Sequence, residues 1–140
     1  MKLVLTKKPL KIAIILLVSY ALLVVLFESL LGYFQPESAS TLQIATIDAD
    51  GTVNQRILAR IDSAEQLYVA ANHWPRAWYR EALANPAVEV SLESGQGSYI
   101  AVTVEGAEHD SVSADNSLGL IFRVLTGFPP RYFLRLDPAG

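Results

Sequence analysis

The feature that most constrains this chain is an apolar run from Ile12 to Phe34, in which Ser19, Tyr20, Glu28 and Ser29 are the main polar interruptions. A helix of this length, at 1.5 Å per residue, crosses a hydrocarbon core of about 30 Å. The rest of the 140-residue chain has room for one small domain, and the apolar content of 51% fits a domain with a membrane segment added to it. We therefore expect a transmembrane helix in residues 1–34 that contacts the lipid bilayer through residues 12–34.

A cleaved signal peptide is the alternative interpretation of the N-terminus. Lysines precede the apolar run, and Ser38-Ala39-Ser40 has the small residues of a cleavage site. The apolar region of signal peptides usually holds about 7 to 15 residues, which is shorter than this run. The length favours an uncleaved anchor. The chain has no cysteine, which excludes a lipoprotein anchor and any disulfide.

Positive charges are segregated along the chain. Every lysine lies within the first eleven residues, and the remaining strong bases are seven arginines that follow the apolar run. By the positive-inside rule, this pattern predicts a cytoplasmic N-terminus and an extracytoplasmic, periplasmic domain. After residue 40, twelve acidic residues outnumber the seven arginines, so the domain has a net charge near −5. Such a surface argues against nucleic acid as a partner.

Residues 35–41 are small and polar with one proline, which is typical of a linker, and residues 42–140 form the domain. Apolar alternation and turn-forming residues between the alternating segments predict strands in this domain. The expected strands are residues 42–47, 53–61, 66–71, 87–93, 98–105 and 131–136. With a helix after the third and another after the fifth strand, this order predicts an α+β domain with an antiparallel sheet or small barrel.

Two helices are expected within the domain. Residues 76–85 follow Pro75 and place Trp78 and Ala82 on one face at a spacing of four. A second helix is expected after the polar stretch 107–113, capped by Ser113 or Asp115. Its apolar stripe would comprise Leu118, Ile121, Phe122 and Leu125. The expected barrel core consists of Leu67, Val69, Trp78, Val88, Val90 and Leu92.

Motifs of metal or hydrolytic chemistry are missing from the sequence. The two histidines, His73 and His109, lie in separate segments without a carboxylate cluster, so we expect no metal site. No Gly-x-Ser-x-Gly motif is present, and Gly95-x-Gly97 is best explained as a hairpin turn.

The segment from Ala71 to Tyr79 is the most informative one for function. A strand ends here, a polar loop follows, and a helix begins at Pro75 and Arg76. Backbone N–H groups at a helix start beside an arginine suit an anion, and the rings of Trp74 and Trp78 offer flat surfaces for a planar ligand. The alternative is structural, with Trp78 in the core and Trp74 anchoring the loop. Both interpretations stay open from these residues alone.

A family resemblance rests on Trp78-Tyr79 followed by Ala84-Asn-Pro-Ala-Val-Glu-Val90. These residues resemble the signature of the deazaflavin (F420)-dependent nitroreductase and quinone reductase family, a relative of the pyridoxamine-phosphate-oxidase-like split β-barrels. Ala101-Val-Thr-Val-Glu-Gly106 and the last strand are also similar to the family pattern, so the resemblance covers residues 42–138. It implies a split antiparallel barrel of about six strands with two helices.

The resemblance also implies a site for F420 or FMN. Arg56 matches the family's basic residue after the first turn, and Asn72 and His73 occupy its polar loop. Arg60 is added because alternation places it on the strand face of Arg56. With the helix-start loop, the expected cofactor-binding residues are Arg56, Arg60, Asn72, His73, Trp74 and Arg76.

Two functions follow as alternatives. The first is a membrane-anchored oxidoreductase that reduces a quinone or nitro compound with F420 or FMN, and that forms a homodimer as split barrels commonly do. The second is a non-catalytic split-barrel binding module that has lost its cofactor phosphate site. Asp48 and Asp50, which stand where the family has basic residues, favour the second function, as does the outward topology. The helix-start loop with Arg76 favours the first, and Glu81 departs from the family's asparagine.

Overall fold

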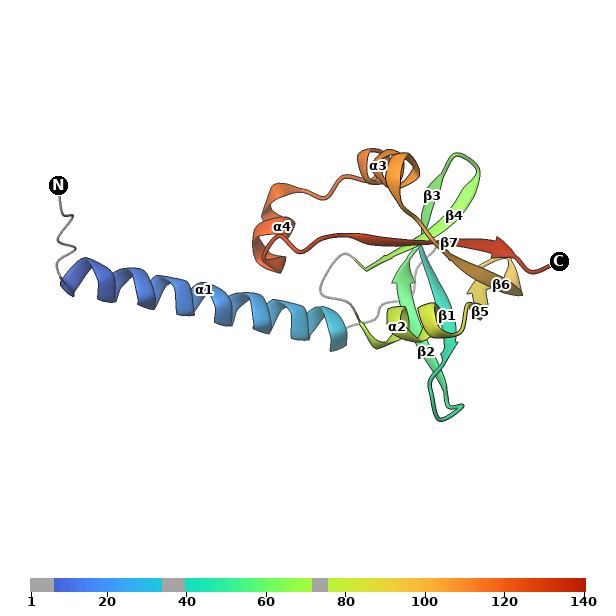
Figure 1. Ribbon diagram of the computed structural model, residues 1–140, viewed down its shortest axis with the longest axis horizontal. Helices are drawn as coiled ribbons and strands as arrows, with labels where there is room; N and C mark the ends of the chain where they lie inside the picture. Colours follow the sequence, from blue (N-terminus) through green and yellow to red (C-terminus); the bar gives the residue numbers. More distant parts are fainter. Residues whose placement is uncertain (1–6, 34–39, 72–75) are drawn as a thin grey trace. The chain divides into compact units, whose positions relative to one another are not determined.

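The computed structural model describes residues 7–33, 40–71 and 76–140 (Figure 1). Within these ranges the chain forms two compact units. The first contains the N-terminal helix and residues 119–128. The second contains the sheet and comprises the described residues of 35–118 and 129–140.

The first unit is built on α1 (Lys7–Tyr33), which is the expected N-terminal helix. Its stretch Lys8–Leu31, 24 residues long, is long and apolar enough to cross a membrane. A shorter helix, α4 (Leu120–Thr126), belongs to the same unit. The rings of Phe27 and Phe122 meet edge to face at 5.9 Å, so the two helices are packed together.

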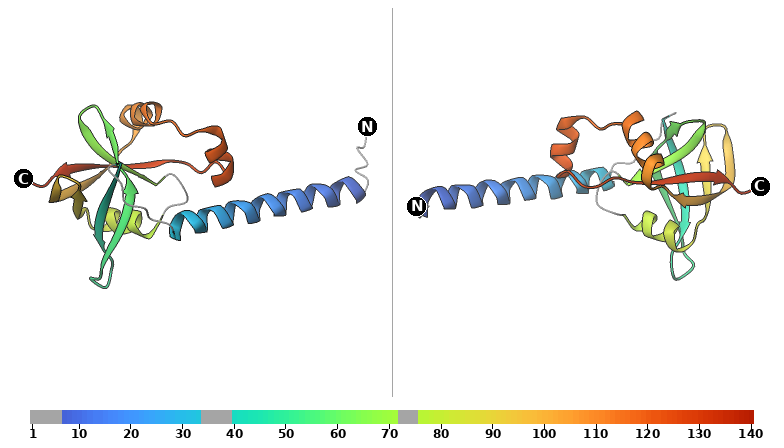
Figure 2. Two further views of the ribbon diagram at one scale, coloured as in Figure 1. Left: turned by 180° about the vertical axis from the view of Figure 1, so that it is seen from behind. Right: turned by 45° about the horizontal axis from the view of Figure 1, so that its top comes forward.

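The second unit is a curled antiparallel sheet (Figure 2). Within the described residues it has seven strands in the order β2-β1-β5-β6-β7-β4-β3. β2, at one edge, also contacts β4 near the opposite edge, and this contact closes the curl. The strands are β1 (Thr41–Ile47), β2 (Val53–Ala59), β3 (Ile61–Ser63), β4 (Gln66–Ala71), β5 (Ala87–Leu92), β6 (Gly95–Thr103) and β7 (Tyr132–Pro138). The expected α+β fold with a split antiparallel barrel is confirmed.

The additional strand arises at Arg60. The extended stretch expected from 53 to 61 breaks there, because β2 pairs with β1 while β3 pairs with β4. The backbone N–H of Arg60 donates to the carbonyl of Ser40 at 2.9 Å and holds this corner. The single strand expected at 53–61 is therefore two strands, β2 and β3, which lie at the two opposite edges of the sheet.

The turn between β1 and β2 is closed by Asp48. Its Oδ1 accepts the backbone N–H groups of Asp50 and Thr52, each at 2.9 Å. Gly51 adopts φ +83°, a conformation that glycine reaches without steric cost. These bonds confirm the expected hairpin.

Helix α2 (Ala77–Ala84) lies against β1 and β6 and buries Trp78 and Ala82, as their spacing predicts. They join a core formed by the inward residues of five strands. The expected core residues Val69, Val88 and Val90 are buried there, and Leu67 and Leu92 pack against it partly buried. The expected core is therefore confirmed.

The prediction of one helix after Ser113 was wrong. The polar stretch 107–113 is itself helical, as part of α3 (Gly106–Asp115), and α3 is preceded by Glu105 as its N-cap. Val112 anchors α3 in a second core cluster with Ile61, Tyr68, Val104 and Phe133. Three of the four expected stripe residues, Ile121, Phe122 and Leu125, belong to α4, which starts after Gly119 and lies in the other unit, whereas Leu118 precedes it and lies in the sheet unit.

Candidate functional site

A cavity of about 480 Å³ lies between β2 and the start of α2. Its walls combine a strand edge with a helix start, both in the second unit. The lining residues are Asn54, Gln55, Arg56, Arg76, Ala77, Trp78 and Glu81. Two of the expected cofactor-binding residues, Arg56 and Arg76, are therefore brought to one cavity.

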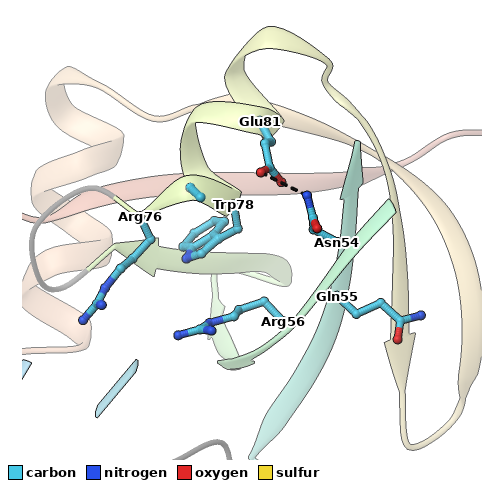
Figure 3. Close-up of a pocket in the computed structure, with 7 residues that line it drawn as sticks. Asn54, Gln55, Arg56, Arg76, Trp78 and Glu81 are labelled. Atoms are coloured by element: carbon cyan, nitrogen blue, oxygen red, sulfur yellow. Dashed lines mark hydrogen bonds between the residues drawn. The ribbon is translucent and has the colours of Figure 1, made fainter. Parts of the chain in front are cut away.

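The two guanidinium groups point to the same side of this cavity, with the ring of Trp78 beside them (Figure 3). Alternation along β2 explains the position of Arg56, because Asn54 and Arg56 share one strand face while Gln55 faces the other way. On that other face, Gln43 Nε2 donates to Gln55 Oε1 at 3.1 Å. The local pairing of β2 with β1 thus aims Arg56 into the cavity.

The start of α2 forms the opposite wall. Arg76 is its N-cap, with an extended backbone and without a hydrogen bond from its own side chain to the helix. Backbone N–H groups in the first turn of a helix lack partners within the helix and carry partial positive charge. The arginine end of the cavity is therefore suited to an anion.

The other end of the cavity is acidic. Glu81 accepts a hydrogen bond from Thr46 Oγ1, which is fully buried, and another from Asn54 Nδ2 at 3.2 Å (Figure 3). The carboxylate is thereby held in place on α2. Among the described lining residues, the two arginines lie at one end of the cavity and the glutamate lies at the other (Figure 3). The cavity therefore has a positive end and a negative end.

The acidic turn does not line this cavity. Asp48 Oδ1 accepts hydrogen bonds from amides of its own turn, and Asp48 Oδ2 accepts one from Asn54 Nδ2 at 3.4 Å. The hydrogen bond from the Thr52 N–H lowers the pKa of Asp48 below its ordinary value. Figure 1 shows the β1–β2 turn projecting beyond the rest of the sheet. Neither Asp48 nor Asp50 is part of the described cavity lining, although Asp48 contacts the lining residue Asn54.

Arg60, another expected cofactor-binding residue, forms an ion pair with Asp62. Its Nε and Nη2 donate to the two carboxylate oxygens of Asp62 at 2.8 and 3.0 Å, and this pairing raises its pKa. Among the described residues, Arg60 is not part of the cavity lining. The remaining expected residues, Asn72, His73 and Trp74, lie outside the described residues.

Sequence reasoning did not assign Asn54 or Thr46 to the site, and it treated Glu81 only as a departure from the family. Asn54 could have been assigned from strand alternation, which places it on the same face as Arg56. Glu81 could have been assigned from its spacing of four residues from Ala77, which places both on the same face of α2. Thr46 had no such signal, because its contact with Glu81 joins residues 35 positions apart.

A second cavity of about 310 Å³ lies where β6, α3 and β7 meet. His109 Nε2 lies 3.0 Å from the carbonyl oxygen of Arg131, and burial lowers the pKa of Arg131. The rings of Tyr79 and Tyr132 are 5.6 Å apart beside it. Within the described residues, no group of three His, Cys, Asp or Glu side chains is placed to hold a metal ion.

No protein-family model matches the sequence, and no curated protein matches it. Several solved structures match the fold. The heme storage protein HutZ from Vibrio cholerae is 22% identical with a TM-score of 0.56, over 74% of this chain and 84% of that one. An F420-H2-dependent reductase is 18% identical with a TM-score of 0.56, over 70% of this chain and 94% of that one.

A third match is a pyridoxamine 5'-phosphate oxidase-related, FMN-binding protein from Nostoc punctiforme. It is 18% identical with a TM-score of 0.51, over 71% of each chain. The domain is a split β-barrel. At these identities the likeness establishes the fold, which proteins that bind F420 and FMN share with this chain.

Proposed function

We propose that this protein is a membrane-anchored oxidoreductase that binds F420 or FMN in the cavity between β2 and α2 and reduces a quinone or nitro compound. The observation that carries the proposal is the convergence of Arg56 and Arg76 beside the start of α2 and the ring of Trp78. The fold adds support, because an F420-dependent reductase and an FMN-binding protein have the same barrel.

The residues of the cavity fit the phosphate end of such a cofactor. Arginine forms strong, charge-assisted hydrogen bonds with phosphate, and a helix start adds backbone N–H donors. The volume of about 480 Å³ lies within the range of about 300 to 1,000 Å³ that is usual for ligand pockets. The cofactor ring supplies the hydride chemistry, and the protein binds and orients it.

Glu81 determines the orientation in which the cofactor binds in the cavity. A carboxylate about 4 Å from a phosphate charge would cost roughly 4 kcal/mol at an effective dielectric near 20, so the phosphate belongs at the arginine end. Hydroxyl or N–H groups of the ligand suit the Glu81 end, because a carboxylate accepts hydrogen bonds. Arg56 and Arg76 on one side and Glu81 on the other therefore specify one orientation.

The lipid bilayer is the proposed partner of α1, with the N-terminus in the cytoplasm and the barrel in the periplasm. Support comes from the length and apolar character of Lys8–Leu31 and from the lysines before it. A reporter fused after Gly140 measures the side of the membrane, and activity of a cytoplasmic reporter would overturn the orientation. We also propose a homodimer, which light scattering of the detergent-purified protein tests.

Cofactor titration of the full chain in detergent tests the site. We expect saturable binding of F420 or FMN by the wild type and weaker binding by Arg56→Ala and Arg76→Ala. Losing one hydrogen bond to a charged group costs about 1.5–3 kcal/mol, which corresponds to a loss in affinity of about 10- to 150-fold. Arg80→Ala is the matched control, because Arg80 is an exposed arginine of α2 outside the cavity lining and should leave the affinity unchanged.

The competing function is a non-catalytic binding module, which Glu81 in the cavity favours. Wild type that binds neither cofactor, together with a Glu81→Asn variant that binds one, would identify a decayed cofactor site. Lack of binding by both proteins would support the module. Heme is a further probe in the same titration, because HutZ shares the fold.

A further inference from the structure

The segment Gly119–Phe128 exposes more apolar surface than a short helix in water ordinarily does. Leu120 is 68% exposed, Ile121 79% and Phe128 51%. The helix within it, α4, has seven residues, and a helix this short is not stable in water without packing. Large apolar side chains exposed together in one short segment are typical of an interaction surface.

This segment packs on one face of α1. Tyr20 Oη donates to the carbonyl of Val124 at 2.7 Å, in addition to the ring contact between Phe27 and Phe122. A Cβ placed on Gly127 would lie 3.3 Å from Cγ1 of Val24. Tyr20, Val24 and Phe27 follow the spacing of a single helix face.

The contacts occupy a defined part of the candidate span. Tyr20 lies at the middle of Lys8–Leu31, and Phe27 lies near its end next to the linker. At 1.5 Å per residue, the contact face is about 10 Å long, less than half of a hydrocarbon core of about 30 Å. If α1 crosses the bilayer, its partner segment lies at the depth of one leaflet.

Part of the backbone at the end of α4 is hydrogen-bonded within the chain. Three carbonyls in the last turn of α4 accept hydrogen bonds from the chain: Phe122 from Thr126 Oγ1 at 2.9 Å, Arg123 from the N–H of Phe128 at 2.9 Å, and Val124 from Tyr20. Water usually satisfies such groups at an exposed helix end. In lipid they must be satisfied within the protein, because each unpaired group costs several kcal/mol.

Arg123 is the one charged side chain of α4, and a charge is costly in hydrocarbon. Its guanidinium lies 5.4 Å from the centre of the Phe128 ring, a favourable cation–π contact. The long side chain of arginine also reaches from apolar surroundings to lipid headgroups.

We propose that residues 119–128 form a re-entrant membrane segment, which enters the leaflet on the barrel side of α1 with Leu120, Ile121 and Phe128 facing the acyl chains. The proposal rests on the proposed anchoring of α1. The chain leaves the sheet unit at Leu118 and returns to it at Pro129, so insertion would attach the barrel to the membrane at a second place.

Site-directed fluorescence quenching tests the proposal, and the absence of cysteine from the natural chain makes single-cysteine labelling direct. The full chain is reconstituted into vesicles of phosphatidylcholine and phosphatidylglycerol. Ile121→Cys is labelled with an environment-sensitive probe, with Leu17→Cys on α1 as the lipid control and Leu83→Cys on α2 as the control for an exposed leucine of the barrel. The quenchers are doxyl-labelled phosphatidylcholine and aqueous iodide.

We expect the Ile121 probe to be quenched by the doxyl lipid as strongly as the Leu17 probe and to be protected from iodide, whereas the Leu83 probe shows the reverse. An Ile121 probe that iodide quenches, while the Leu17 probe remains in lipid, overturns the re-entrant segment and leaves the anchor intact. Iodide quenching at both positions overturns the anchor as well. Protection of the Ile121 probe from both quenchers would show that protein, such as a second copy of the chain, covers the patch, and would also overturn the proposal.

Discussion

Helices α2 and α4 are of similar length, eight and seven residues, yet they use their apolar residues in opposite ways. In α2, which also carries Arg80 and Glu81, Trp78 and Ala82 are 5% and 1% exposed. In α4, which is much more apolar, the buried residue is the polar Thr126, while Ile121 is 79% exposed. Apolar content alone therefore does not indicate that a helix belongs to a core.

The surroundings of the two helices explain the difference. α2 packs against β1 and β6 of the curled sheet, and its inward residues Trp78 and Ala82 join the core formed by the sheet. α4 has one partner helix in its unit and turns the rest of its surface outward. The sheet covers the apolar residues of α2, and we propose that lipid covers the exposed apolar residues of α4.

The largest expected effect comes from matched truncations on the two helices. Trp78→Ala should lower the free energy of unfolding by about 3–5 kcal/mol, the usual cost of deleting a large buried aromatic side chain. Ile121→Ala should change it by no more than about 0.5 kcal/mol, as is usual for a surface position. Urea denaturation of both variants in detergent, followed by circular dichroism, measures the difference. Equal losses would mean that Ile121 is part of a core and would remove the contrast.

Helix α3 provides a third case, because it is held largely by charges. Of its ten residues only Val112 is buried. Glu108 Oε1 accepts hydrogen bonds from Tyr68 Oη and Arg135 Nη1, both at 2.8 Å. Arg135 Nε also donates to Asp137 at 2.7 Å, so one arginine links α3 to β7.

This network should make the stability of the barrel sensitive to acid. The hydrogen bond from Arg135, followed by that from Tyr68, lowers the pKa of Glu108 below its ordinary value of 4.5. A carboxyl with a lowered pKa in the folded state stabilises the protein above its unfolded pKa, and this contribution is lost as the pH falls through the folded value. We expect the free energy of unfolding to decline below about pH 5.

Glu108→Gln should lower the free energy of unfolding by about 1–2 kcal/mol at pH 7, because the partly exposed pair is weakened by solvent. The variant should also lose part of the acid dependence. Glu93→Gln, which changes an exposed carboxylate in the β5–β6 turn, is the matched control. Urea denaturation at pH 7 and pH 4 measures both effects, and an unchanged pH profile in Glu108→Gln would show that the network contributes nothing.

Local patterns predicted the parts of the fold that local interactions determine. The turn at Asp48, the burial of Trp78 and Ala82, and the alternation of β5 all follow from residues close in sequence. The break at Arg60 was not predictable in the same way, because it depends on which distant strands β2 and β3 pair with. Helix α3 was missed because its polar residues show no apolar period.

The lining of the cavity between β2 and α2 divides in the same way. A helix-start pattern drew attention to Arg76 and the family resemblance to Arg56, and both line this cavity. The pairing of Arg60 with Asp62 was accessible from strand alternation and was overlooked. The anchoring of Glu81 by Thr46 was not accessible, since it requires α2 to lie on β1.

The smallest expected effect concerns how the two compared helices end. The C-cap of α2, Asn85, has an ordinary extended backbone with φ −133°, whereas that of α4, Gly127, has φ +78°. Gly127→Ala should weaken the end of α4 by about 1 kcal/mol, because an alanine in the left-handed region is strained. The new Cβ would also press on Val24 at 3.3 Å and disturb the packing of α4 on α1.

Gly119, at the other end of α4, is the matched control for this variant. It has φ −62° and nothing within 4 Å of a Cβ placed there, so Gly119→Ala adds neither left-handed strain nor a clash. Because Gly119 is the N-cap of α4, where alanine is less favourable than glycine, any cost falls at the start of the helix and not at its end. Hydrogen exchange of the Phe128 amide, which donates to the carbonyl of Arg123, reports on the end of the helix in micelles. We expect exchange roughly fivefold faster in Gly127→Ala, since a tenfold change corresponds to about 1.4 kcal/mol, and a smaller change in Gly119→Ala. Equal acceleration in both variants would mean that the left-handed turn and the contact with Val24 do not hold α4 on α1, and the re-entrant segment would lose the packing on which it depends.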